Sequence, residues 1–302
     1  MTLGYDKQLY ILAFDHRGSF EKMFGISGRK PTDDETIKIQ DAKHLIFEGF
    51  QRALSEGAPK DAAGVLVDGQ YGPTVATDAR AAGINLAMPV EKSGQNEFDF
   101  EYGEQFGEKI LEYDPTFSKV LVRYNPEGDA GMNERQTVRL KRLGDWLHEN
   151  DRKFLFELLV PAEEEQLARV DGDGDRYDVE IRPDLMIQAI SELLTNGVEP
   201  DIWKIEGIDK REKCAEIAEL TRSGGRDEVS CVVLGRGASD AKVDEWLQAA
   251  AGLTGYRGFA IGRSIFGEAV KALAAGDGDR DAGVTQIADN YRRFIDVYEA
   301  AS

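Results

Sequence analysis

A lysine stands at the centre of an apolar stretch that is typical of a buried β-strand, Asp201-Ile-Trp-Lys204-Ile-Glu206-Gly207. Burial removes water from an ammonium, so such a site favours the neutral amine, which can attack a ketone and form a Schiff base. Glu206 is expected on the same side of the strand as Lys204, because side chains there alternate with period two. A structural ion pair or a surface edge strand is the alternative interpretation.

Two more charged residues lie in apolar runs elsewhere in the chain. Lys119 begins the run Lys-Val-Leu-Val, and Glu157 stands inside Phe-Leu-Phe-Glu-Leu-Leu-Val. A carboxylate in such a run is rarely buried without a partner, so we expect Glu157 to meet a lysine. If Lys119, Glu157 and Lys204 share one interior, the charge of Lys119 favours the neutral Lys204 amine while Glu157 shuttles protons. A purely structural ion network is the alternative.

Asp15 closes a third apolar run, Tyr-Ile-Leu-Ala-Phe, and is followed directly by His16 and Arg17. Its carboxylate is a candidate general acid or base, and it is also a candidate partner that holds a lysine in place. The alternative is an N-cap for a short helical turn that follows.

Few residues in the sequence favour metal chemistry. The three histidines are His16, His44 and His148, and the last two fall in helix-like segments, so a zinc site is not expected. A magnesium site built from Asp15 and Asp68 is the alternative that stays open. Because the sequence offers so few metal ligands, we expect no metal and no cofactor.

These residues need a scaffold that brings several strand ends together. Apolar runs typical of strands recur at 9–14, 64–68, 84–88, 119–124, 153–160, 202–206, 230–235 and 258–262. Amphipathic, helix-like stretches lie at 33–56, 73–82, 102–113, 133–150, 182–197, 210–222, 239–253, 264–275 and 282–300. Eight strands, each followed by a helix, predict a single-domain α/β fold over residues 1–302, a (β/α)₈ TIM barrel with a long loop at 161–181. A doubly wound open sheet is the structural alternative, although no Gly-x-Gly-x-x-Gly follows the first strand.

Active sites of such barrels lie at the carboxyl ends of the strands, so polar residues there become candidate ligands. Those expected to contact a substrate are His16, Arg17, Asp68, Arg123 and Glu206. The loops after strands seven and eight often bind phosphate through backbone N–H groups at a helix N-terminus. These loops contain Gly235, Arg236, Gly237, Gly262 and Arg263, and the two arginines would add charge-assisted hydrogen bonds. Ordinary glycine turns with solvated arginines are the alternative.

Composition limits the partners. The net charge of −19 repels the phosphates of nucleic acids, and an anionic substrate therefore needs a locally positive pocket. No apolar run approaches the ~20 residues that span a bilayer, and the N-terminus lacks the features of a signal peptide. Cys214 and Cys231 indicate reduced thiols in a cytoplasmic protein. The expected partner is a small phosphorylated keto-sugar or keto-acid substrate, with neither nucleic acid nor membrane, and homo-oligomerisation is left open.

Longer motifs carry a family resemblance that runs from about Leu9 to the last helix. They are LAFDHRGSF, VLVDGQYG, KVLVRYNP, FLFELLVP, IRPDL, GVEPDIWKIEG, LGRGAS and AIGRSIF. Together they resemble the class I aldolases of the tagatose-1,6-bisphosphate aldolase type. They resemble still more closely the 5-dehydro-2-deoxygluconate-6-phosphate aldolase domain of inositol catabolism. The resemblance implies a carbon–carbon lyase whose working residues are Asp15, Lys119, Glu157 and the imine-forming Lys204.

The sequence departs from the tagatose type at three positions. His16 stands where those enzymes tend to carry glutamine, and Arg123 and Asn125 replace more neutral or acidic neighbours. The resemblance therefore implies a substrate with a carboxylate at one end and a phosphate at the other, cleaved to dihydroxyacetone phosphate and malonate semialdehyde. Arg123 or Arg17 would hold the carboxylate. A ketose (tagatose or fructose) 1,6-bisphosphate aldolase is one alternative, and a non-catalytic sugar-phosphate sensor is another.

Overall fold

Eight strands form a closed parallel barrel. The computed structural model describes residues 2–276 and 278–302 and places the strands in sequence order, with β8 hydrogen-bonded back to β1. Their bounds are β1 Leu9–Ala13, β2 Ala63–Leu66, β3 Asn85–Pro89, β4 Phe117–Arg123, β5 Lys153–Leu159, β6 Ile202–Glu206, β7 Ser230–Leu234 and β8 Tyr256–Ile261. The predicted (β/α)₈ barrel is confirmed, and closure of the sheet rules out the open doubly wound alternative.

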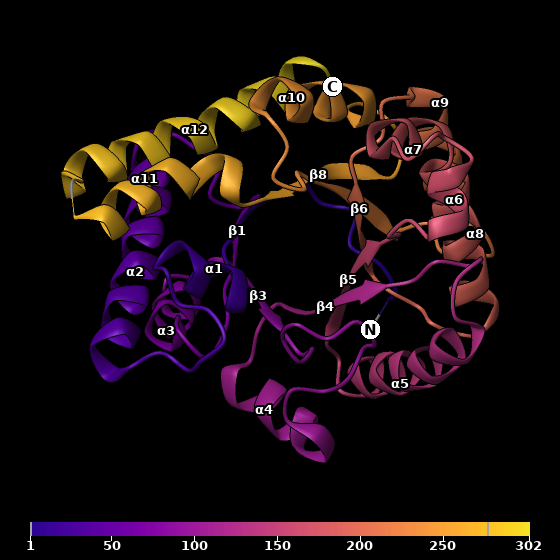
Figure 1. The fold of residues 1–302 in the computed structure, drawn as a ribbon, viewed down its shortest axis with the longest axis horizontal. Coiled ribbons are helices and arrows are strands. Elements are labelled where there is room, and N and C mark those ends of the chain that lie inside the picture. The colour runs from indigo at the N-terminus through magenta and orange to yellow at the C-terminus, as the bar shows by residue number, and fades with distance from the viewer. Residues whose placement is uncertain (1, 277) are drawn as a thin grey trace.

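Helices surround this barrel (Figure 1). They are α1 Gly18–Met23, α2 Asp33–Ser55, α3 Pro73–Ala81, η1 Gly103–Gln105, α4 Phe106–Tyr113, α5 Ala130–Glu149, α6 Glu164–Ala168, α7 Gly174–Glu180, α8 Arg182–Thr195, α9 Arg211–Arg222, α10 Asp240–Ala250, α11 Arg263–Ala275 and α12 Arg280–Ala300. Each helix expected from the sequence is present, with ends that differ by at most three residues; the one expected at 102–113 is divided into η1 and α4.

The expected long loop at 161–181 was wrong, because it contains the two short helices α6 and α7. Each has its own start signal: Glu163 and Gln166 form a capping box before α6, and the Asp173 side chain accepts the backbone N–H groups of Asp175 and Arg176 in α7. With 5 and 7 residues, these helices make about two turns at most, too few for a recognisable 3.6-residue period.

Side chains that point into the barrel form an apolar layer below a charged one. Alternate residues of each strand face inwards, so Phe117, Leu155 and Ile202 join the interior apolar cluster. Two positions further along the same strands stand Lys119, Glu157 and Lys204, which are also buried. The apolar layer closes the barrel below, and the charged layer lies towards the carboxyl ends of the strands.

The longest helix, α2, begins at a capping box. The Thr32 hydroxyl accepts the backbone N–H of Glu35, and the Glu35 carboxylate accepts the N–H of Thr32. Asp33 and Asp34 add negative charge to the first turn, where the helix dipole favours it. These contacts fix where α2 starts, and its buried face carries a charged residue, Lys43.

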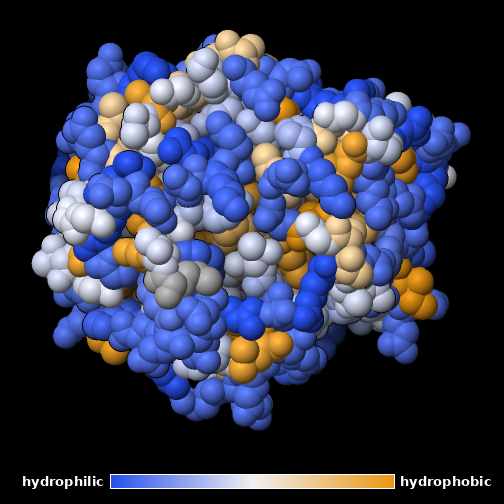
Figure 2. Space-filling view, turned by 180° about the vertical axis from the view of Figure 1, so that it is seen from behind, coloured by the Kyte–Doolittle hydropathy of each residue, from blue (hydrophilic) through white to orange (hydrophobic). Residues whose placement is uncertain are grey.

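The face of the protein opposite to that in Figure 1 is mainly polar. Figure 2, which shows the side opposite to Figure 1, has a largely hydrophilic face with scattered small apolar areas. This distribution suits a chain whose net charge is −19. Among residues 2–276 and 278–302, no helix has the length and apolar character that crossing a membrane requires.

Candidate active site

The register of β5 against β6 places Glu157 beside Lys204. The two residues are Cα partners in the parallel ladder, and both side chains point into the barrel. The Lys204 Nζ lies 2.9 Å from Glu157 Oε1. On the other side of β5, Lys119 pairs with Leu155, and its Nζ reaches Glu157 Oε2 at 3.0 Å. One carboxylate therefore contacts both interior lysines.

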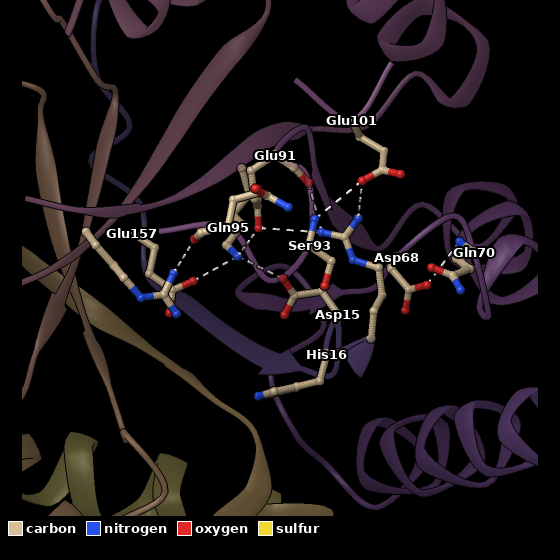
Figure 3. Close-up of polar contacts among 12 residues, drawn as sticks. Asp15, His16, Asp68, Gln70, Glu91, Ser93, Gln95, Glu101 and Glu157 are labelled. Atoms are coloured by element: carbon tan, nitrogen blue, oxygen red, sulfur yellow. Dashed lines mark hydrogen bonds and ion pairs between the residues drawn. The ribbon is translucent and has the colours of Figure 1, made fainter. Parts of the chain in front are cut away.

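Lys119 is the centre of a wider cluster in which three carboxylates surround one ammonium. Its Nζ lies 2.8 Å from Asp15 Oδ2, 2.7 Å from Glu91 Oε1 and 3.0 Å from Glu157 Oε2. Figure 3 shows these three acidic side chains converging from different parts of the barrel. The structure thus brings together the four residues that the family resemblance named, Asp15, Lys119, Glu157 and Lys204, and their catalytic roles stay predictions.

Mutual attraction keeps the cluster ionised in spite of its burial. Burial raises the pKa of Asp15 and of Glu157, but the charges of Lys119 and Lys204 contribute to an opposing effect that outweighs it, so both carboxyl groups have a pKa below the usual range. Burial in turn lowers the pKa of Lys119, but its carboxylate partners outweigh this and raise the pKa well above the ordinary value. At neutral pH Lys119 is therefore a cation, and Asp15 and Glu157 are carboxylates.

Asp15 does not cap the helix that follows it. The N-cap position of α1 is Arg17, whose side chain makes no capping hydrogen bond, while Asp15 directs its carboxylate at Lys119. Of the three roles considered for Asp15, the N-cap was therefore wrong, and the observed contact is the one that holds a lysine in place.

Glu91 was missed by sequence reasoning although it belongs to the cluster. It follows the end of β3 and is buried, with Oε2 lacking a hydrogen-bond partner among the described residues. Burial raises the pKa of Glu91, whereas the charges of Lys119 and Arg17 lower it. The effect of burial is larger than theirs, and the pKa of Glu91 is raised overall. The signal that could have found it is a carboxylate two residues beyond an apolar strand, the same rule that singled out Asp15.

A cavity opens at the carboxyl ends of the strands, with a volume of about 650 Å³. Lys204 and Glu157 lie on its inner wall, and Lys119 is buried behind them. The other predicted site residues on its wall are His16, Arg123, Glu206, Gly235, Arg236, Gly237, Gly262 and Arg263. Of the segment from 161 to 181, α7 contributes Tyr177 and Asp178 to the wall, so this segment shapes the site.

The loops after β7 and β8 lie side by side at this cavity. Arg236 has a left-handed backbone with φ of 50°, and the Arg263 guanidinium donates to its carbonyl oxygen at 3.0 Å. Gly262 immediately precedes α11, and a Cβ there would lie 2.3 Å from the carbonyl oxygen of Ala13, so only glycine fits. The N-terminus of α11 and two guanidinium groups supply N–H donors and positive charge to this corner of the cavity.

Arg236 already has two carboxylate partners. Its Nη1 lies 2.5 Å from Asp178 Oδ2 on α7, and its Nε lies 3.1 Å from Glu206 Oε1. The other oxygen of Glu206 accepts the N–H of Val160 at 2.8 Å. Burial raises the pKa of Glu206, whereas the guanidinium groups of Arg182 and Arg236 lower it. The effect of burial is the larger, so the pKa of Glu206 is raised overall. An anion bound at Arg236 must therefore share this guanidinium with Asp178 and Glu206.

His16 and Arg123 occupy other parts of the wall. The His16 ring packs against Phe266 and lies 3.2 Å from where a Gly262 Cβ would stand. Burial lowers the pKa of His16 to about 4, so its imidazole is neutral at physiological pH. Arg123 donates to the backbone oxygen of Gln95 at 2.9 Å, which leaves the rest of its guanidinium facing the cavity.

Arg17 and Asp68 lie outside the cavity, in contrast to the other predicted ligands. Arg17 donates to the backbone oxygen of Glu91 at 2.9 Å and to the Glu101 carboxylate at 3.2 Å, so it binds the β3–α4 connection. Asp68 is fully buried and lies 2.9 Å from the ammonium of Lys43. Both residues were predicted as ligands because they follow the carboxyl end of a strand. That position does not determine the direction in which the side chain points.

Residues 4–302 match the protein family described as an uncharacterized protein conserved in bacteria, DUF2090. The chain belongs to this family. The match begins before β1 and ends after α12, so it includes all the site residues described above.

Curated proteins of similar sequence are named tagatose 1,6-diphosphate aldolases. One from Listeria monocytogenes serotype 4a (strain HCC23) is 28% identical over 200 residues, which are 65% of this chain and 54% of that protein. Tagatose 1,6-diphosphate aldolase 1 of Streptococcus pyogenes serotype M1 is 23% identical over 225 residues, 68% of this chain and 63% of that protein. The aligned region thus spans little more than half the length of these relatives. The expected resemblance to this group is confirmed, and the closer resemblance to the inositol-catabolism domain stays a prediction.

Solved structures with a similar fold include a Corynebacterium glutamicum protein, with a TM-score of 0.55, 20% identity and coverage of 97% of this chain and 88% of that one. A Schiff base-forming fructose-1,6-bisphosphate aldolase has a TM-score of 0.53 and 14% identity, with coverage of 96% and 94%. At these identities the likeness shows the shared barrel.

Proposed function

We propose that this protein is a class I aldolase that cleaves a phosphorylated ketose through a Schiff base on Lys204. The pairing of Lys204 with Glu157 at 2.9 Å inside the cavity is the observation that carries this proposal. An amine that can pass its proton to an adjacent carboxylate is an activated nucleophile for a ketone. Arg236 and Arg263 on the same wall supply an anion receptor for a phosphate. The names of the curated relatives support the same chemistry.

In the proposed reaction, Glu157 accepts a proton from Lys204, and the neutral amine adds to the C2 ketone. Glu157 returns that proton to the carbinolamine hydroxyl, which leaves as water and gives a protonated imine. Glu157 then removes the proton of the C4 hydroxyl, and the electron pair of the C3–C4 bond moves into the iminium as the bond breaks. For a ketose 1,6-bisphosphate, the C4–C6 fragment leaves as glyceraldehyde 3-phosphate. Glu157 then gives the proton that it took from the C4 hydroxyl to C3 of the enamine, and hydrolysis of the imine releases dihydroxyacetone phosphate and restores Lys204.

Lys119 and Asp15 support Glu157 in this scheme. Lys119 touches the Glu157 oxygen that Lys204 does not, so it orients the carboxylate and favours its ionised form. Asp15 holds Lys119 from the side of β1 at 2.8 Å. Because Glu157 lies on the cavity wall, we assign the main proton transfers to Glu157 and the positioning of Lys119 to Asp15.

A ketose 1,6-bisphosphate is the substrate that the named relatives favour. One phosphate would bind at Arg236 and Arg263, and the second would bind at Arg123. Among the described cavity residues, Arg123 is the arginine that remains once those two are assigned to the first phosphate. The Gln95 carbonyl holds one of its nitrogens, which fixes the direction of the guanidinium.

A second candidate substrate is 5-dehydro-2-deoxygluconate 6-phosphate, and the single guanidinium of Arg123 favours it. A planar guanidinium matches one carboxylate in a bidentate geometry, whereas a phosphate dianion usually recruits more donors. With this substrate Lys204 would attack the C5 ketone, and Glu157 would remove the proton of the C3 hydroxyl. The products would be dihydroxyacetone phosphate and malonate semialdehyde.

Release of dihydroxyacetone phosphate from tagatose and fructose 1,6-bisphosphates and from the carboxylated substrate tests the proposal and ranks the candidates. Arg123→Ala should weaken cleavage of the preferred substrate at least tenfold. Arg142→Ala, which removes a surface arginine paired with Glu104, serves as the matched control. No release from any of the three compounds would contradict the aldolase proposal.

We also propose a cytoplasmic location for the enzyme. Cys214 and Cys231 are buried free thiols. Burial raises the pKa of Cys214 to about 11 and that of Cys231 to about 12, so both are unreactive and suit a reducing compartment.

A further inference from the structure

A buried lysine on α2 binds the backbone on both sides of Asp15. Lys43 Nζ donates to the carbonyl oxygen of Phe14 and, at 2.8 Å, to that of His16. Its third partner is Asp68 Oδ2 at 2.9 Å, and neither charged side chain is exposed. Two of the three N–H donors of this ammonium are used by the carbonyl oxygens, and Asp68 supplies the counter-charge in a buried ion pair.

The other end of this contact is also fixed. Asp68 follows β2, and its Oδ1 accepts the backbone N–H groups of Gln70 at 3.0 Å and of Tyr71 at 2.8 Å. The ring of Phe20 covers the Lys43 ammonium, with its centroid 4.3 Å from Nζ. Lys43 is therefore held between α2, α1 and the end of β2, in a site without exposure to solvent.

The backbone around Asp15 lies just beyond the sheet. β1 ends at Ala13, and the N–H of Phe14 donates to Leu66 on β2 at 2.8 Å. The next carbonyl groups, those of Phe14 and His16, are the ones that Lys43 binds. Since they flank Asp15, they determine the direction in which its carboxylate leaves the chain.

We infer that Lys43 and Asp68 form a positioning clamp that aims Asp15 at Lys119. Neither residue lines the cavity, so the clamp acts through the backbone and not by contact with a ligand. Its effect on catalysis rests on the proposed aldolase function, but its effect on the contact between Asp15 and Lys119 does not. Without the clamp, Asp15 should move away from Lys119, and turnover should fall more than substrate affinity does.

The test uses a double substitution, because Lys43→Met alone would leave Asp68 as a buried, unpaired carboxylate and could prevent folding. Lys43→Met with Asp68→Asn removes both charges, and the Asn oxygen can still accept the N–H groups of Gln70 and Tyr71. The crystal structure of this variant gives the distance between Asp15 and Lys119, and steady-state kinetics give kcat and KM.

A matched control exists at the opposite end of the barrel. Lys153 Nζ binds the carbonyl oxygens of Thr2 and Gly4 at 2.6 and 2.7 Å and lies 2.9 Å from Asp201. This is the same arrangement of one lysine, one aspartate and two carbonyl groups, but it is remote from the cavity. Lys153→Met with Asp201→Asn should lower the melting temperature and leave kcat within twofold of the wild type.

For the Lys43 and Asp68 double variant we expect Asp15 to lie more than about 3.5 Å from Lys119, beyond hydrogen-bonding distance. We expect kcat to fall by at least about tenfold, with a smaller change in KM. A folded variant that keeps the contact and has kcat within twofold of the wild type would overturn the clamp. If the wild type itself cleaves none of the candidate substrates, the proposed function fails, and the distance alone decides whether the clamp exists.

Discussion

Lys204 Nζ and Glu157 Oε1 lie 2.9 Å apart on neighbouring strands whose register pairs the two residues directly. The second oxygen of the same carboxylate lies 3.0 Å from Lys119, which has further carboxylate partners of its own. Glu157 can therefore exchange a proton with Lys204 while Lys119 stays charged. Lys204 therefore has the chemical role, and Lys119 has a structural and electrostatic one.

Lys204→Met should abolish turnover and leave the fold intact. The substitution removes the nucleophile, but Glu157 keeps its contact with Lys119, so no carboxylate is left buried without a partner. Activity assays combined with circular dichroism and a melting curve check both parts. Lys242→Met, at a half-buried lysine on α10 that pairs with Asp209, is the control and should retain activity. Substantial turnover in a folded Lys204→Met protein would exclude the imine assignment.

Glu157→Gln should lower kcat by on the order of 10²–10⁴-fold, because the amide cannot accept a proton. Glu91→Gln is the matched comparison, since Glu91 contacts the same lysine but does not line the cavity. We expect a much smaller loss of kcat for Glu91→Gln. If the two variants lose activity equally, proton transfer does not belong to Glu157 in particular.

Arg236→Gln should raise the KM for a phosphorylated substrate with a smaller effect on kcat. A hydrogen bond to a charged group contributes about 1.5–3 kcal/mol, which corresponds to a change of about 10–150-fold. Competition from Asp178 and Glu206 for the same guanidinium would place the effect near the lower limit. Arg176→Gln, at an arginine of α7 that is not among the cavity-lining residues, is the control. An unchanged KM would move phosphate binding away from Arg236.

Asp201 should make stability depend on pH at the end of the barrel remote from the cavity. Burial raises the pKa of Asp201, but hydrogen bonds from His148, from two backbone N–H groups and from Lys153 outweigh it, and the net pKa is lowered. A carboxyl group with a lowered pKa in the folded state stabilises the fold above its unfolded pKa of about 3.9. That contribution is lost as the pH falls through the lower, folded pKa.

Chemical denaturation at several pH values between 7 and 3 measures this contribution. The wild type should be more stable than Asp201→Asn at neutral pH, and the difference should shrink as the pH is lowered. Asp227→Asn, at an exposed aspartate, should show no such trend. A difference between wild type and Asp201→Asn that stays constant over this range would mean that Asp201 is not the titrating group.

The fold and the central cluster could be predicted because the sequence encodes both by periodicity. Charged residues at inward positions of otherwise apolar strands, Lys119, Glu157 and Lys204, must share the interior of a closed barrel. The barrel rule for strands seven and eight likewise placed Arg236 and Arg263 on one wall.

What the sequence did not reveal depends on packing between elements. Lys43 lies on a long amphipathic helix, where a lysine is usually solvated, and only the docking of α2 against β1 and β2 buries it. Asp178 lies on α7, a helix too short to leave a periodic signal. Arg17 was located correctly at a strand end, but its side chain turns towards Glu101 and away from the cavity.

Borohydride reduction in the presence of dihydroxyacetone phosphate, followed by intact mass measurement and peptide mapping, tests the Schiff base most directly. We expect one reduced adduct on the peptide that contains Lys204, and none in the Lys204→Met protein or without the phosphate ester. The absence of an adduct although the ester binds, or an adduct on another lysine, would contradict the assignment of Lys204 as the nucleophile.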